Sequence, residues 1–117
     1  MCDKNHLNHI TSSVADGAKQ IFGDKLRTVI LYGSYARGDY DGNSDVDIFL
    51  LLDLPKEQLW KYRDPVSEMT SRLSLEDDDC TTISVHKQDA ETFEQYRNVL
   101  PFFKNVLNEG VLLYERA

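Results

Sequence analysis

Two short apolar runs constrain the fold of this chain more than any other feature. The first, Thr-Val-Ile-Leu-Tyr at residues 28–32, is too short for a helix and is typical of a strand buried on both faces. The second, at residues 48–52, continues from the alternating stretch Asp45-Val46-Asp47, which predicts a strand over 45–52 with one polar end. Two such strands require a sheet that other elements cover.

Helical periodicity surrounds these strands. Apolar residues recur at three- and four-residue steps over residues 7–22 and again over residues 55–73, a pattern typical of helices with one buried face. Gly23 is placed to end the first helix. Pro65 lies inside the second pattern, so that helix is expected either to kink or to split into two pieces at Asp64.

The last third of the chain continues the alternation of strands and helices. We expect a strand over 81–86, a helix over 90–97, a helix over 102–109 that Gly110 caps, and either a strand or an apolar tail over 111–114. This order predicts an α/β (α+β) fold, with one mixed β-sheet covered by helices, in a single domain over residues 1–117.

The charge balance narrows the class of protein. The chain has 117 residues with 13 Lys and Arg against 20 Asp and Glu, a formal charge of −7. This balance argues against direct nucleic-acid binding through bulk charge and suits a divalent metal. Cys2 and Cys80 are expected to be free thiols in a reducing cytosol, and no apolar stretch is long enough to span a membrane, so we expect a cytoplasmic protein.

The segment from Gly33 to Asp47 combines two weak signals into one chemical task. Asp45 and Asp47 alternate along a strand and therefore project to the same side, with Cα atoms roughly 6.6–7 Å apart. Two carboxylates at that separation suffice for Mg²⁺, which completes its shell with water and substrate phosphates. Gly33 and Ser34, at the end of the preceding strand, allow a short helix start that binds phosphate through its amides.

This segment resembles the signature of the nucleotidyltransferase superfamily that includes DNA polymerase β, and specifically its small stand-alone branch, the minimal nucleotidyltransferase (MNT) domains. Residues 33–38, GSYARG, are similar to the Gly-Ser-aromatic-Ala-Arg-Gly form of that branch. Residues 44–48, SDVDI, are similar to its Ser-Asp-hydrophobic-Asp-hydrophobic form. The resemblance is strong over residues 29–52 and weaker over residues 101–106 and 109–114.

The resemblance implies a polymerase β-like nucleotidyltransferase fold and a magnesium-dependent protein that binds ATP. It places Gly33 and Ser34 at the phosphates and makes Asp45 and Asp47 the catalytic metal ligands. The motif positions of Arg37 and Ser44 make them further candidates for nucleotide contact. Arg37 is equally well interpreted as a surface cation that pairs with Asp39 or Asp41.

MNT proteins are commonly encoded beside a HEPN-domain ribonuclease toxin and act as its antitoxin by transferring AMP to tyrosine. The resemblance therefore implies a protein adenylyltransferase of the EC 2.7.7 type with a HEPN-type partner. Because 117 residues leave no space for an acceptor domain, the acceptor is expected on another chain, in a homo- or hetero-oligomer. Nucleotide transfer to a small molecule is a more remote reading for the same reason.

One position departs from the pattern of the superfamily. Its third carboxylate, often the base that activates the attacking hydroxyl, corresponds here to Ser84. Asp79 or Asp89 would replace it only if the strand register differed. Since general base catalysis contributes ~10²–10⁴-fold, the alternative function is a weak or inactive MNT domain that neutralises a toxin by binding alone.

The three histidines, His6, His9 and His86, lack metal-ligand spacing, and the sequence assigns them no place in this site.

Overall fold

The computed structural model describes residues 4–41, 44–76 and 82–116, and its elements follow the predicted order. The helices are α1 (Lys4–Phe22), α2 (Ser34–Arg37), α3 (Arg63–Glu76), α4 (Ala90–Tyr96) and α5 (Pro101–Glu109). The strands are β1 (Leu26–Tyr32), β2 (Val46–Leu52), β3 (Ile83–Asp89) and β4 (Val111–Glu115). Short 3-10 turns cover Gly23–Lys25 and Lys56–Tyr62.

The four strands form one mixed sheet in the order β3-β2-β1-β4. Strand β1 is antiparallel to both β2 and β4, whereas β2 is parallel to β3. The predicted mixed sheet is therefore confirmed, and the two apolar runs of the sequence are its central strands.

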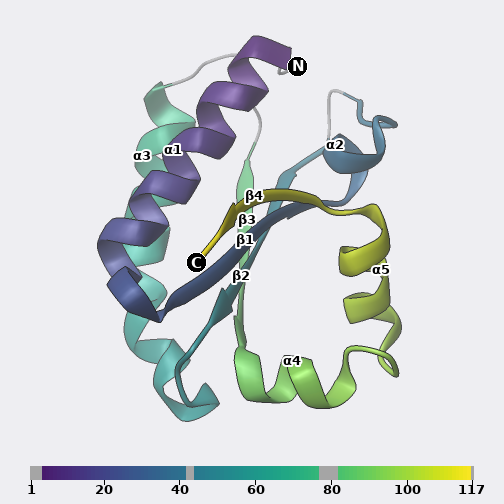
Figure 1. Ribbon diagram of the computed structural model, residues 1–117. Coiled ribbons are helices and arrows are strands. Elements are labelled where there is room, and N and C mark those ends of the chain that lie inside the picture. The colour runs from purple at the N-terminus through teal and green to yellow at the C-terminus, as the bar shows by residue number, and fades with distance from the viewer. Residues whose placement is uncertain (1–3, 42–43, 77–81, 117) are drawn as a thin grey trace.

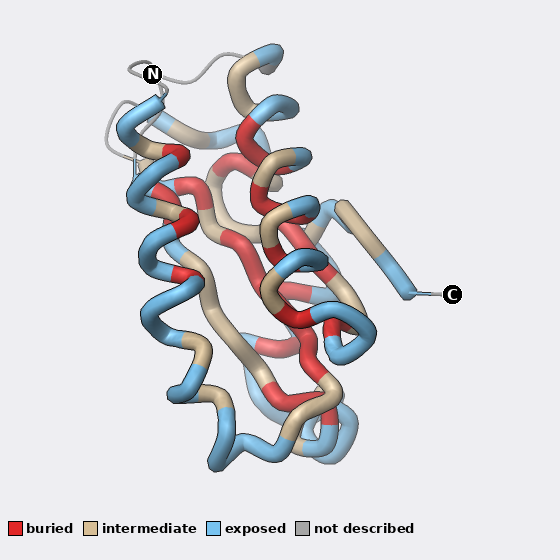
Figure 2. Tube along the Cα trace, turned by 90° about the vertical axis from the view of Figure 1, so that its left-hand side faces the viewer, coloured by how far each residue is buried: buried red, intermediate tan, exposed pale blue. Residues whose placement is uncertain are grey.

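Helices cover both faces of this sheet (Figure 1). Helices α1 and α3 lie side by side on one face, where their apolar residues join those of β1 and β2 in the larger core cluster. Figure 2 shows buried positions recurring along these two helices while their outer turns are exposed. On the other face, α4 and α5 contribute Phe93, Phe103 and Val106, which pack against Ile30 and Phe49 of the sheet.

The boundaries of several elements differ from the prediction. The second helical pattern is split into two pieces, which was one of the two predicted alternatives, and the break falls where α3 begins. Pro65 therefore lies in the first turn of α3, where its missing N–H costs no hydrogen bond within the helix. Strand β3 extends to Asp89 rather than ending at His86. Residues 111–115 form a strand, which resolves the other alternative.

None of the helices in the described ranges is long and apolar enough to cross a membrane.

Candidate active site

A sharp turn after β1 starts the site. Gly33 adopts a φ of 78°, a region that favours glycine, and α2 begins at the next residue. The carbonyl of Gly33 accepts from the amides of Ala36 and Arg37, both at 3.1 Å. The predicted short helix at Ser34 is therefore present, and its first amides precede the bonded turn, as at any helix start.

The same turn brings the glycine against the metal-ligand candidate Asp47. The residue before the turn, Tyr32, is the cross-strand partner of Asp47 in the β1–β2 pair. A Cβ added at Gly33 would overlap the Asp47 carboxylate, with Cγ only 3.2 Å away. Glycine is thus required at this position both by backbone conformation and by the close carboxylate, and the two halves of the sequence motif meet here.

The two acidic candidates differ in their surroundings. Asp47 lies in β2 and is half-buried, whereas Asp45 precedes the strand and is exposed, a small correction to the predicted strand start. Partial burial, followed by the charge of Asp45, raises the pKa of Asp47, and Arg37 opposes this shift. A divalent cation beside the pair would offset the repulsion between the carboxylates.

The residues present fit such a cation as a pair rather than as a closed cage. Within residues 4–41, 44–76 and 82–116, no group of three or more His, Cys, Asp or Glu side chains is arranged to hold a metal. Two carboxylates are nevertheless sufficient for Mg²⁺, because water and substrate phosphates commonly supply its other ligands.

Arg37 forms ion pairs with two acidic residues. Its Nε donates to Oδ2 of Asp39 and its Nη1 donates to Oε2 of Glu109, both at 3.1 Å. Hydrogen bonds to Asp39 and then Glu109 raise the pKa of Arg37. The ion pair with Asp39 agrees with the interpretation of Arg37 as a surface cation. The ion pair with Glu109, at the end of α5, was not predicted from the sequence.

Ser44, the residue before Asp45, hydrogen-bonds to Asp41. Its hydroxyl accepts from the amide of Asp41 at 3.0 Å and donates to Oδ1 of the same residue at 3.4 Å. This local arrangement places Ser44 directly before the acidic pair.

The strand register locates the expected third carboxylate. In the parallel pair of β2 and β3, Ser84 is the partner of Asp47, so a serine stands beside the acidic pair.

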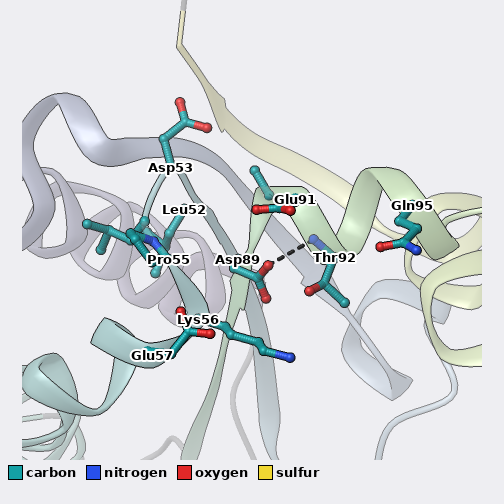
Figure 3. A pocket seen from close by; sticks show the side chains of 11 residues that line it. Leu52, Asp53, Pro55, Lys56, Glu57, Asp89, Glu91, Thr92 and Gln95 are labelled. Atoms are coloured by element: carbon teal, nitrogen blue, oxygen red, sulfur yellow. Dashed lines mark hydrogen bonds between the residues drawn. The ribbon is translucent and has the colours of Figure 1, made fainter.

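Asp89 is at the other end of that register, opposite Leu52. Its buried carboxylate accepts from the amide of Thr92 at 2.8 Å and caps α4, so it is too far from Asp47 to act as the base (Figure 3). Asp79, like Cys2 and Cys80, lies outside the described residues.

Aromatic side chains lie beside Asp47 and Ser84 on the face of the sheet that α4 and α5 cover. The ring of Phe49 stacks on His86 at 5.5 Å, with an angle of 13° between the planes, and Phe102 of α5 lies against both rings. Tyr32 contacts Phe49 and Phe102 at its edges, and burial, followed by the charge of Asp47, raises its pKa. The sequence assigned His86 no place near the acidic pair, although Ser84 and His86 alternate along one strand and therefore share a face.

A hollow at the opposite end of β2 and β3 is separate from this site (Figure 3). Its lining includes Asp53, Lys56, Glu57 and Glu91, and none of the predicted site residues. The residues that the sequence predicted for the site thus lie near α2, away from this hollow.

A mixed sheet with helices on both faces, whose first two strands are joined through a Gly-Ser turn and an Asp-x-Asp pair, defines a nucleotidyltransferase. The nucleotidyltransferase domain family matches residues 12–106, and the chain belongs to this family. The fold and the family that the sequence predicted are both confirmed.

Individual relatives agree with this assignment. The chain is 41% identical over 92 residues to a candidate protein adenylyltransferase of Methanocaldococcus jannaschii, MJ0141, covering 78% of this chain and 82% of that protein. A candidate nucleotidyltransferase from Sulfolobus solfataricus has a similar structure, with a TM-score of 0.60 and 22% identity, covering 94% of this chain and 80% of that chain.

A further structural neighbour is a chain from the complex of tri-AMPylated Shewanella oneidensis HEPN toxin with MNT antitoxin. Its TM-score is 0.51 at 18% identity, and the match covers 94% of this chain and 73% of that chain. At this identity the likeness concerns the fold.

Proposed function

We propose that this chain transfers AMP from ATP to a protein hydroxyl with the help of Mg²⁺, and that its acceptor is a tyrosine of a HEPN-type toxin for which it is the antitoxin. The close approach of Gly33 to Asp47 carries the proposal, because it joins the phosphate-binding and metal-binding halves of the motif. The name of the Methanocaldococcus relative supports protein as the acceptor class, and the HEPN–MNT complex supports the kind of partner.

Each site residue has a defined part in this reaction. Asp45 and Asp47 would hold the metal, which would supply positive charge against the triphosphate. The first amides of α2 and the hydroxyl of Ser34 donate to phosphate oxygens. Arg37 exchanges a carboxylate partner for the pyrophosphate that leaves, and Ser44 holds the loop in place before Asp45.

The transfer itself is an in-line displacement. The acceptor oxygen forms a bond to the α-phosphorus, the bond from that phosphorus to the bridging oxygen of the β-phosphate breaks, and pyrophosphate leaves. In this proposal the acceptor hydroxyl is carried by a separate chain.

A second candidate function is toxin neutralisation by binding alone. The observation that favours it is Ser84, which stands beside Asp47 at the place where the superfamily carries its third carboxylate. In that case the protein would occupy the toxin without modifying it.

One experiment separates the two functions. The chain is incubated with α-labelled ATP, Mg²⁺ and the protein encoded by the adjacent gene, and label on that protein is measured together with relief of its toxicity. We expect label in the wild type, loss of label in Asp45→Ala and Asp47→Ala, and no loss in Glu68→Gln, an exposed carboxylate of α3. Relief of toxicity that persists without label in both aspartate variants would favour binding alone, and absence of both in the wild type would refute the proposal.

A further inference from the structure

The site has a metal-ligand pair and a phosphate-binding turn, but Ser84 offers no carboxylate that could take a proton from the acceptor. We propose that His86 is the general base of the transfer. The inference rests on the proposed function, and it identifies the group that activates the acceptor hydroxyl.

His86 lies two residues after Ser84, which is the next position on the same face of β3. Asp47 pairs with Ser84 and Phe49 pairs with His86 in the parallel ladder, so all four side chains share one face. The Cα atoms of Ser84 and His86 are roughly 6.6–7 Å apart by strand geometry. The imidazole extends farther from the sheet than a serine hydroxyl does, and the side chain is only half-buried.

Aromatic contacts on two sides hold the ring of His86. Phe49 lies under it at 5.5 Å in a nearly parallel arrangement, and the ring of Phe102 meets it edge-on at 5.0 Å. A ring held in this way loses little further freedom when a hydroxyl approaches it, which is a requirement of an efficient proton acceptor.

A chain of hydrogen bonds selects the tautomer of His86. The carboxylate of Asp89 accepts from the amide of Thr92 through Oδ2 and from the side-chain nitrogen of Gln88 through Oδ1, at 2.8 and 3.1 Å. Because a carboxylate only accepts, the side-chain amide of Gln88 must turn its oxygen toward His86, where Oε1 lies 2.9 Å from Nε2. That oxygen also only accepts, so in the neutral ring Nε2 carries the proton and Nδ1 carries the lone pair.

The proton balance of the step follows from this tautomer. As the acceptor oxygen bonds to the α-phosphorus and pyrophosphate leaves with the electron pair of the broken bond, the acceptor proton passes to Nδ1 of His86. The resulting imidazolium keeps its Nε2–H bond to Gln88 and returns the extra proton to solvent after turnover. Gln88 and Asp89 act as positioning residues, because they act through their hydrogen bonds to the His86 ring and to each other.

The tautomer is tested without activity. Nitrogen-15 NMR of the histidine rings in the full chain should show that the neutral ring of His86 carries its proton on Nε2, and Gln88→Leu should shift the neutral population toward Nδ1–H. A wild type in which His86 is protonated at Nδ1 alone would overturn the proposal.

The catalytic role is tested with the labelled-ATP assay and a double mutant. We expect His86→Gln to slow transfer by about 100-fold or more, with unchanged binding of α,β-methylene-ATP, whereas His9→Gln, which removes an exposed imidazole of α1, should be neutral. Ser84→Asp should restore at least about tenfold to His86→Gln, because it supplies a carboxylate base at the neighbouring position.

The outcomes distinguish the two proposals. Transfer by His86→Gln within threefold of the wild type, or no recovery in the double mutant, would overturn the role of His86 and leave adenylyl transfer standing. A wild type that transfers no label would overturn both.

Discussion

Replacing Asp47 by asparagine should stabilise the metal-free protein while abolishing AMP transfer. The carboxylate is half-buried beside a like charge, and both burial and Asp45 raise its pKa. An amide of the same shape keeps the packing and removes the cost of holding the charge there. An unfavourable charge of this kind is expected at a position where function takes precedence over stability.

The size of the effect follows from Coulomb's law. At roughly 7 Å, two unit charges repel by about 0.6 kcal/mol in water and about 2.4 kcal/mol at an effective dielectric constant of 20. Because Asp45 is exposed and Arg37 offsets part of the field at Asp47, the lower end applies to the repulsion. With the relief of partial burial, the total gain is about 1 kcal/mol, which corresponds to roughly 3–6 °C in Tm for a domain of this size.

The assay is thermal unfolding in the presence of a chelator, with Asp45→Asn and the double variant as controls. Asp45→Asn should gain only the repulsion, and the double variant should gain less than the sum of the single variants, because both remove the same pair interaction. A carboxyl whose pKa is raised by folding destabilises the protein above that pKa and favours folding as it protonates, so the gain from Asp47→Asn should be full at pH 7 and shrink on acidification. A lower Tm for Asp47→Asn, or additive effects, would refute this account.

Three further outcomes are expected. Gly33→Ala should lower the free energy of unfolding by about 1–3 kcal/mol through backbone strain, and further through overlap with the Asp47 carboxylate. Gly23→Ala should lower it less, because Gly23 also has a positive φ but an added Cβ there meets no neighbour. Urea unfolding of both variants measures the difference. With Mg²⁺ well below saturation, its stabilisation of the wild type in a thermal shift assay should weaken on acidification at a higher pH than the ordinary aspartate pKa of about 3.9. Under that condition bound metal does not displace the titration, so a midpoint at or below that value would contradict the raised pKa of Asp47. Asp89→Ala should cost about 1 kcal/mol through loss of the cap on α4, while Glu91→Ala should be near neutral by the same unfolding assay, and equal losses would argue against the cap.

The sequence predicted the parts of this molecule that depend on local pattern. The apolar run ending at Tyr32, the glycine after it and the helical periodicity of α1 each follow from neighbouring residues, and all three are present. The two-residue alternation of Asp45 and Asp47 likewise needed no knowledge of the rest of the chain. Local chemistry therefore sufficed for the elements and for the acidic pair.

The features that could not be predicted depend on residues distant in sequence or on side-chain geometry. The pairing of Arg37 with Glu109 joins positions 72 residues apart, and no periodicity in the sequence indicates it. The extension of β3 through Lys87 and Gln88 was missed because polar residues have low strand propensity, which pairing with the apolar strand β2 overrides. The hydrogen bond of His86 to Gln88 depends on how two side chains turn toward each other, which composition does not record.

The antiparallel connection between β1 and β2 has an evolutionary consequence. Because the glycine turn and the acidic pair both belong to residues 26–52, one continuous segment of the chain carries both halves of the motif. Helices α4 and α5 come later in the chain, and α5 touches this segment through Glu109, which pairs with Arg37, and Phe102, which lies against Tyr32. Substitutions in these later helices can therefore alter the surface beside the motif without changing the residues of the motif itself.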